Sequence, residues 1–295
     1  MPEMPEIQAH AERMAASLVG RPLESFELLN FATLKTFDPP ADGAVGYPLR
    51  GIRRRGKYLI FDFGNDTSHV VHLMQGGRLR PDPKRTKKPR QGLARWVFAG
   101  SDGTGEDASV ADEAWLLTEA GSERKAGVWA VSTPHLSDNE NPHNPLGHLG
   151  PEAHDLDQAT LGALLSSHSR RIHGVLRDQR VLAGLGRLLT NEILYEAALS
   201  PFANAAKLSP DEIGQLHLAI GEVVERATVH ERTLTDIGKS ADRPSKVHNR
   251  EGEPCVDCAE SIRSVTYRAY TVYYCPQRQT NGKRLADNTT SRFLK

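Results

Sequence analysis

The sequence has few cysteines, no net charge and no long hydrophobic run. Three cysteines in 295 residues are too few for the disulfide scaffold of a small secreted protein, and their number is odd. No apolar stretch approaches the roughly 18 residues of a membrane-spanning helix. Residues 1–6 are too acidic and proline-rich for a signal peptide. We therefore expect a cytoplasmic protein that makes no contact with a membrane.

The charges cancel in sum but are divided unevenly along the chain, which has 37 basic and 37 acidic side chains. Residues 50–95 hold 13 basic and 3 acidic side chains, a net charge of +10. Residues 101–160 hold 2 and 12, a net charge of −10. A basic block of this kind is either a solvated loop or a face that contacts phosphate. The zero net charge therefore does not exclude binding to nucleic acid.

Apolar periodicity predicts an N-terminal helix followed by a β-domain. Ile7, Ala11, Met14 and Leu18 recur at helical spacing, and Gly20 ends the pattern. Short apolar runs separated by turn residues follow, as is typical of antiparallel strands in a sandwich or barrel. These runs lie at residues 58–63, 69–73, 96–98, 115–117 and 128–131.

The second half of the sequence has a helical texture and ends in a predicted hairpin. Helices are predicted at residues 158–168, 172–180, 187–198 and 209–229, and a hairpin at 262–274. We expect an α+β protein of four parts. They are an N-terminal β-sandwich at 1–131, a linker at 132–152, a helical domain at 153–235 and a hairpin region with a basic tail at 236–295.

The first residues offer a nucleophile. If Met1 is removed, Pro2 becomes an N-terminal secondary amine, and α-amino groups have a pKa of roughly 7.7–8.0 in peptides. Such an amine can attack an aldehyde-like carbon and form an iminium, and Glu3 could move protons beside it. The alternative is that Pro2 and Glu3 simply begin a helix.

Six motifs, in order along the chain, resemble those of the formamidopyrimidine-DNA glycosylase and endonuclease VIII family. They correspond to the N-terminus, the catalytic-lysine hairpin, the next strand, the junction between domains, the helix–two-turn–helix element and the terminal zinc finger. In this sequence they are residues 1–6, 54–59, 72–80, 148–152, 184–201 and 252–277.

The resemblance implies a fold, an activity and a partner. The fold is an N-terminal antiparallel β-sandwich with a helix, a helical domain with the two-turn element, and a zinc-finger-like hairpin. The activity is that of a monomeric bacterial base-excision-repair enzyme, a DNA glycosylase and abasic-site lyase that flips oxidised bases out of damaged double-stranded DNA. Pro2 would attack the sugar C1′ to form a Schiff base, Glu3 would protonate the opening sugar, and Lys57 would contact the lesion. Elimination would then cut the strand.

The same resemblance implies a set of DNA contacts. Gly184 and Gly186 suit a tight turn into a helix whose free N–H groups face a phosphate, although an ordinary helix start has the same pattern. His72 is either a phosphate contact or a histidine packed on its strand. The implied DNA-binding residues are His72, Arg124, Gly186, Arg187, Asn191 and Arg268.

The zinc finger is incomplete. Cys255, Cys258 and Cys275 supply three thiolates, but Arg278 stands where the fourth cysteine is expected. A structural zinc site needs four ligands, and arginine has no acceptor to offer. The three thiolates could recruit His248 or a water molecule. We expect a metal-free or labile finger rather than a fully occupied zinc site.

Other departures concern how the family opens the DNA stack. Ala126 replaces the phenylalanine of the strand-separating wedge, Gln75 replaces the methionine that fills the void, and Tyr270 replaces an arginine that contacts phosphate. These changes leave two alternatives to a repair enzyme. One is a DNA-binding relative with little glycosylase activity, and the other is a metal-binding interaction module.

Overall fold

The computed structural model describes residues 1–100, 111–121, 124–238, 242–267 and 270–285. The chain divides into two compact units by contact. Unit 1 consists of residues 1–148 and 231–238, and unit 2 of residues 149–230 and 239–295. No helix of the described residues is long and apolar enough to cross a membrane.

Unit 1 begins with helix α1 (Met4–Leu18). A capping box between Glu3 and Glu6 starts the helix, since the Glu3 backbone N–H donates to the Glu6 carboxylate at 3.0 Å. The four apolar residues that predicted this helix are all buried. The helix is therefore confirmed, and its first turn directly follows Pro2 and the N-cap Glu3.

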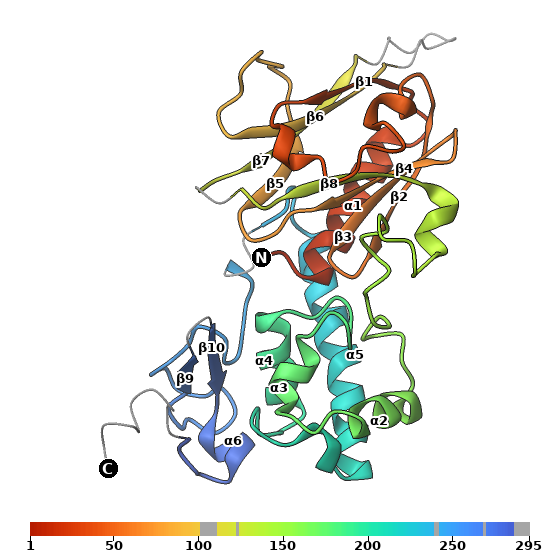
Figure 1. Ribbon diagram of the computed structural model, residues 1–295. Helices are drawn as coiled ribbons and strands as arrows, with labels where there is room; N and C mark the ends of the chain where they lie inside the picture. Colours follow the sequence, from red (N-terminus) through yellow and green to blue (C-terminus); the bar gives the residue numbers. More distant parts are fainter. Residues whose placement is uncertain (101–110, 122–123, 239–241, 268–269, 286–295) are drawn as a thin grey trace. The chain divides into compact units, whose positions relative to one another are not determined.

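Unit 1 also contains two antiparallel four-stranded sheets (Figure 1) and the short 3-10 helices η1 (Phe31–Thr33), η2 (Ala41–Ala44) and η3 (Thr133–Ser137). One sheet has the order β1–β6–β7–β5, and its strands are β1 (Leu23–Leu28), β6 (Gly92–Phe98), β7 (Glu113–Glu119) and β5 (Gly77–Pro81). The other has the order β2–β3–β4–β8, with β2 (Leu49–Arg55), β3 (Tyr58–Phe63), β4 (Thr67–His72) and β8 (Gly127–Ser132). Apolar side chains from both sheets and from α1 form one core cluster. The predicted antiparallel sandwich is confirmed.

The strands that apolar periodicity did not predict, β1, β2 and β5, all lie at the edges of their sheets. Edge strands are only partly covered, so their apolar patterns are weak; in β2 only Leu49 is fully buried among several arginines. Residues 72–80, expected as a single strand, contain the end of β4, a turn and β5. A side chain at Gly77 would collide with the Leu73 carbonyl oxygen, so glycine allows this tight turn.

Unit 2 contains most of the helices and the terminal hairpin. Its helices are α2 (Gln158–Ser166), α3 (Ile172–Leu176), α4 (Arg187–Glu196), α5 (Pro210–Arg232, whose last two residues belong to unit 1) and α6 (Pro276–Thr280). The predicted hairpin is β9 (Arg263–Tyr267) paired with β10 (Tyr270–Tyr274). Helix α3 ends earlier than predicted because Asp178 accepts a hydrogen bond from the Arg180 backbone and starts a turn. The combination of sandwich, helical domain and hairpin confirms the α+β class.

Candidate functional site

The N-terminal candidates are held by the start of α1. Glu3 is only 3% exposed, and Pro2 beside it is also buried. Glu3 is the N-cap of the helix, so its backbone is fixed by the capping box with Glu6. The two residues therefore share a defined position rather than a loose terminus.

Lys57 lies in the two-residue turn between β2 and β3 and is 4% exposed. Gly56 precedes it with φ +57°, a conformation that glycine adopts without strain and that suits a tight hairpin turn. This short turn, rather than a long loop, determines where the lysine lies.

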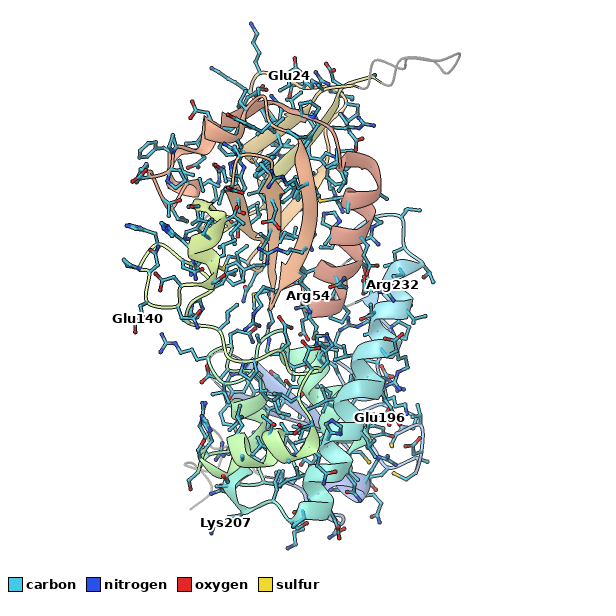
Figure 2. The ribbon with its side chains drawn as sticks, turned by 90° about the vertical axis from the view of Figure 1, so that its right-hand side faces the viewer. Glu24, Arg54, Glu140, Glu196, Lys207 and Arg232 are labelled. Atoms are coloured by element: carbon cyan, nitrogen blue, oxygen red, sulfur yellow. The ribbon has the colours of Figure 1, made fainter. Side chains whose placement is uncertain are left out.

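Arg54 connects this turn to α1, and Figure 2 labels it beside the helix. Its Nε donates to the Gln8 side chain of α1 at 3.1 Å, and its Nη1 donates to the Gly56 carbonyl at 2.9 Å. One side chain thus joins the helix that begins after Pro2 and Glu3 to the turn that carries Lys57. Arg54 belongs to the motif at residues 54–59, but this role could not be seen from the sequence.

His72 is 8% exposed at the end of β4, and its ring meets that of Tyr58 edge-on at 4.5 Å. Burial lowers its pKa to about 4, with further contributions from the charge of Lys57 and from His148. The Met74 backbone N–H donates to His72 Nδ1 at 3.0 Å, so the proton of the neutral ring is on Nε2. His72 is therefore a neutral hydrogen-bond donor near Lys57 and not a cation.

The segment that corresponds to the family's strand-separating wedge contains both an exposed and a buried residue. Arg124 is exposed with φ +24°, whereas Ala126 belongs to the hydrophobic core of unit 1. The Ala126 backbone N–H donates to the Glu119 carboxylate at 2.7 Å, which holds this residue inward. Gln75 is exposed at the tip of the turn between β4 and β5. Residue 126 therefore lies in the core of unit 1 and also has a small side chain.

The two-turn element of unit 2 presents a cation at a helix start. Gly184 has φ +97°, Gly186 is the N-cap of α4, and Arg187 is the exposed first residue of that helix. Gln179 holds the loop, because its side chain accepts from the Gly184 backbone N–H at 3.0 Å and donates to the Leu185 carbonyl at 2.8 Å. This geometry suits a phosphate at the N-terminus of α4.

Asn191 lies inside unit 2, at 1% exposure. His173 Nε2 donates to its amide oxygen at 3.1 Å, and its amide nitrogen donates to His248 Nδ1 at 2.7 Å. Its neighbour Glu192 accepts hydrogen bonds from the backbone N–H groups of residues 246–248. Both side chains therefore hold the segment before the hairpin, which gives Asn191 a supporting position instead of a surface one.

Arg177 is a cation that the sequence analysis missed. Its guanidinium carbon lies 3.9 Å from the ring centroid of Tyr270, and the same ring stacks with His173 at 5.7 Å. A guanidinium on an aromatic face keeps its N–H groups at the rim, where they can meet an anion. No motif marked Arg177, because its partner lies on β10, far along the chain. Arg268, the predicted contact beside Tyr270, lies outside the described residues.

The three cysteines form a cluster in which each Sγ lies within 4.8 Å of the others. Among the described His, Cys, Asp and Glu residues, none joins this cluster as a fourth ligand. His248 Nδ1 is already the acceptor for Asn191, and Arg278 cannot ligate a metal. The donor set is therefore an incomplete zinc site, and it does not fit a four-coordinate structural zinc.

Comparison with known proteins agrees with these motifs. The family model of the formamidopyrimidine-DNA glycosylase N-terminal domain matches residues 1–113, and the H2TH domain model of the same enzyme matches residues 149–237. An uncharacterized formamidopyrimidine-DNA glycosylase-like protein of Mycobacterium tuberculosis is 40% identical over 152 residues, which are 50% of this chain and 94% of that protein. The formamidopyrimidine-DNA glycosylase of Chloroflexus aurantiacus is 28% identical over 287 residues, covering 94% of this chain and 96% of that enzyme.

Solved structures share the fold. The Lactococcus lactis formamidopyrimidine-DNA glycosylase, bound non-covalently to DNA containing an abasic site, superposes with a TM-score of 0.78 at 22% identity. MutM in complex with DNA containing carbocyclic 8-oxo-G has a TM-score of 0.79 at 23% identity. Each comparison covers 95% of this chain and 100% of the other. With these matches, the resemblance is confirmed, and the chain belongs to the formamidopyrimidine-DNA glycosylase family.

Proposed function

We propose that the protein is a bifunctional DNA glycosylase and abasic-site lyase that removes oxidised bases from double-stranded DNA in the bacterial cytoplasm. The observation that carries this proposal is the bridge made by Arg54. It joins the helix that begins after Pro2 and Glu3 to the turn that holds Lys57. A nucleophile, a carboxyl group and a cation on one rigid frame are what Schiff-base chemistry at a sugar carbon requires.

In this proposal each residue has one task. Once Met1 is removed, the secondary amine of Pro2 attacks C1′ of the flipped nucleotide, and the base leaves as the Schiff base forms. Glu3 protonates the opening sugar ring and assists the later proton transfers. Lys57 stabilises negative charge at the lesion, and the neutral His72 donates Nε2–H to a phosphate oxygen.

Two arginines of unit 2 would contact the backbone of the DNA duplex. Arg187 at the start of α4 and Arg177 on Tyr270 are suited to phosphate oxygens. Arg124 would contact the strand from unit 1. We assign Gly186 to the phosphate site at the N-terminus of α4, and the buried Asn191 to support of the segment before the hairpin.

Borohydride trapping tests the chemistry directly. Protein whose N-terminus has been shown by mass spectrometry to be Pro2 is incubated with an abasic-site duplex and borohydride. A covalent protein–DNA adduct is expected in the native chain and in Glu12→Gln, a surface substitution in the same helix. It should be lost in a variant that retains Met1, whose Pro2 nitrogen is an amide. No adduct in the native chain would refute the proposal.

A second candidate function is a DNA-binding relative with little excision activity. The buried Ala126 and the exposed Gln75 favour it, because neither residue supplies a wedge for the base stack. Tight binding to abasic-site DNA with no cleavage under single-turnover conditions would support this candidate. Excision assays with 8-oxoguanine, formamidopyrimidine, thymine glycol and dihydrouracil duplexes would define the preferred lesion.

A further inference from the structure

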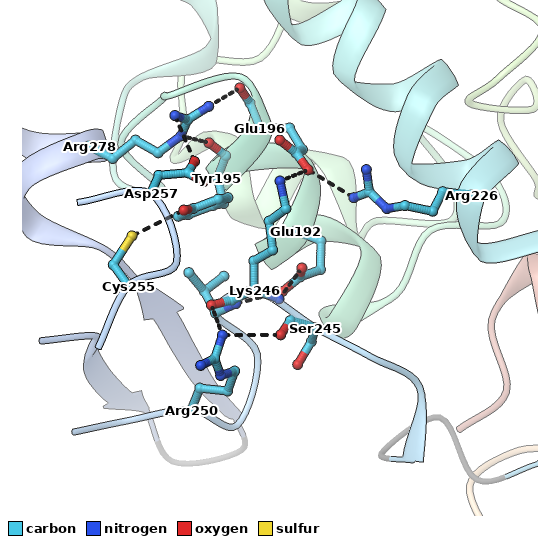
Figure 3. Close-up of polar contacts among 11 residues, drawn as sticks. Glu192, Tyr195, Glu196, Arg226, Ser245, Lys246, Arg250, Cys255, Asp257 and Arg278 are labelled. Carbon is cyan, nitrogen blue, oxygen red and sulfur yellow. Dashed lines mark hydrogen bonds and ion pairs between the residues drawn. The ribbon is translucent and has the colours of Figure 1, made fainter. Parts of the chain in front are cut away.

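Arg278, at the position of the missing fourth cysteine, is engaged with helix α4 instead of pointing to solvent (Figure 3). Its Nε donates to the Tyr195 carbonyl at 2.8 Å, and its Nη2 donates to the Glu196 carbonyl at 3.2 Å. These two residues end α4, where carbonyls are left without i+4 partners; the Tyr195 carbonyl also accepts from the Ala198 backbone N–H at 3.1 Å, so Arg278 is a second donor to it. A cation at this end also interacts favourably with the helix dipole.

The third nitrogen of the guanidinium meets the loop that carries the cysteines. Arg278 Nη1 lies 3.0 Å from the Asp257 carboxylate, and Asp257 stands between Cys255 and Cys258. All three nitrogens of the planar group are therefore used, two on α4 and one on the cysteine loop. A zinc ion in a complete finger would likewise join the cysteine loop to the end of the hairpin.

Tyr195 completes the arrangement. The Arg278 guanidinium carbon lies 4.9 Å from the centre of the buried Tyr195 ring, and the Tyr195 hydroxyl lies 3.0 Å from Cys255 Sγ. The Cys255 thiol thus has a polar partner without a metal ion. Tyr195 is in contact with both the cation and one of the thiols.

Gln279, the residue after Arg278, makes a parallel set of bonds. Its amide nitrogen donates to the Leu199 carbonyl at 3.0 Å, and its amide oxygen accepts from the Cys275 backbone N–H at 2.9 Å. Helix α6 is therefore attached both to the segment after α4 and to the last cysteine. These bonds also involve no metal ligand atom.

We propose that the terminal hairpin is a metal-independent unit, and that Arg278 replaces a fourth ligand by fastening it to the C-terminal end of α4. A planar guanidinium can serve three acceptors at once, which a lysine ammonium at the end of a flexible stem cannot match in geometry. The unit in question comprises the cysteine loop, β9, β10 and α6. It resists chelators, and Arg278 joins it to the end of α4 beside the bonds of Gln279 to the segment after α4.

The test uses the full-length protein and no DNA, so its outcome is independent of the proposed repair activity. Hydrogen exchange of the β9 and β10 peptides is measured with and without a zinc chelator, and zinc content is measured by elemental analysis. The variants are Arg278→Ala, Arg278→Lys and Arg278→Cys. The matched control is Arg226→Ala, which removes an exposed arginine whose ion pair with the Glu196 carboxylate is 2.8 Å long.

In the native chain we expect well under one zinc per molecule and no effect of the chelator on exchange. Arg278→Ala should speed exchange in β9 and β10 by roughly tenfold or more, the effect of losing a charge-assisted hydrogen bond. Arg278→Lys should give a smaller increase. The exchange rate of α1 should stay unchanged in all Arg278 variants, and the exchange rate of β9 and β10 should stay unchanged in Arg226→Ala. Arg278→Cys should bind about one zinc and become sensitive to the chelator.

Three results would overturn the proposal. The first is one zinc per native molecule, with faster exchange in the hairpin after chelation. The second is an Arg278→Ala variant whose hairpin exchanges at the native rate. The third is equal zinc content in Arg278→Cys and the native chain.

Discussion

The indole N–H of Trp96 donates to Nδ1 of His69 at 2.9 Å, and this bond crosses between the two sheets of unit 1. Trp96 is on β6 of one sheet and His69 is on β4 of the other. The second ring nitrogen of His69 lies 2.9 Å from the Ala41 carbonyl, so Nε2 carries the proton. Both side chains are fully buried. The core of the sandwich therefore contains a neutral histidine whose two nitrogens are both engaged.

This arrangement predicts an acid-sensitive unit 1. Burial lowers the pKa of His69 to about 4, whereas the unfolded chain binds a proton near pH 6.5. The stability due to the neutral ring is complete above about pH 6.5 and is lost as the pH falls toward 4, by an amount of roughly 3 kcal/mol. Urea unfolding between pH 8 and pH 4.5, followed by tryptophan fluorescence, measures this loss.

His69→Gln provides the comparison, because glutamine keeps a donor and an acceptor but does not titrate. We expect a shallower fall in unfolding free energy with pH in this variant, whatever its stability at pH 8. His143→Gln, at an exposed position of the same unit, is the control and should follow the native profile. Parallel profiles for His69→Gln and the native chain would show that His69 does not cause the acid sensitivity.

Restoring the family's wedge by one substitution should fail. Ala126 is surrounded by core side chains, so Ala126→Phe overpacks the site and should cost about 1–3 kcal/mol of unfolding free energy. Gln75→Met is the matched control, since Gln75 is exposed at a turn and should tolerate the change. Thermal unfolding of both variants checks this. An Ala126→Phe variant as stable as the native chain would mean that the side chain turns outward.

The capping box should support both stability and catalysis. Glu6→Ala removes the acceptor of the Glu3 backbone N–H, and loss of such a cap costs about 1 kcal/mol. We also expect slower borohydride trapping, because Pro2 and Glu3 directly precede the weakened turn. Glu12→Gln, in the same helix as Glu6, removes the ion pair with Arg232 of α5 but keeps an acceptor for Gln8, so it should change neither result strongly. If the rate of borohydride trapping is unchanged in Glu6→Ala, the capping box does not contribute to the reaction.

The sequence predicted much of the fold because local patterns define it. Periodicity located α1 and the central strands, and the alternation of side chains at 262–274 located the hairpin. Three of the four edge strands, β1, β2 and β5, were not located by periodicity because partial burial gives them no clear alternation, whereas the largely buried edge strand β8 was predicted. Pro2, Glu3 and Lys57 came from short motifs, and they remain predictions until the chemistry is tested.

The contacts that the sequence could not predict are those between distant segments. Arg278 and Tyr195 are 83 positions apart, and no local pattern links them. The supporting position of Asn191 could not be predicted for the same reason, because its side chain donates to His248, 57 positions away. The sequence identified the missing zinc ligand, but only the packing of α6 against α4 shows what the replacing arginine does.

Arg177 should account for one phosphate contact if the protein binds DNA as proposed. Its guanidinium carbon lies 3.9 Å from the centre of the Tyr270 ring, so its position depends on that ring. Arg177→Leu should lower the slope of log affinity against log salt by about 0.9, the change expected for one phosphate neutralised. Tyr270→Phe keeps the ring and should retain the slope, whereas Tyr270→Ala should weaken binding. Arg226→Leu is the control, because Arg226 is already paired with Glu196. A slope in Arg177→Leu equal to the native value would exclude Arg177 from the DNA-binding surface.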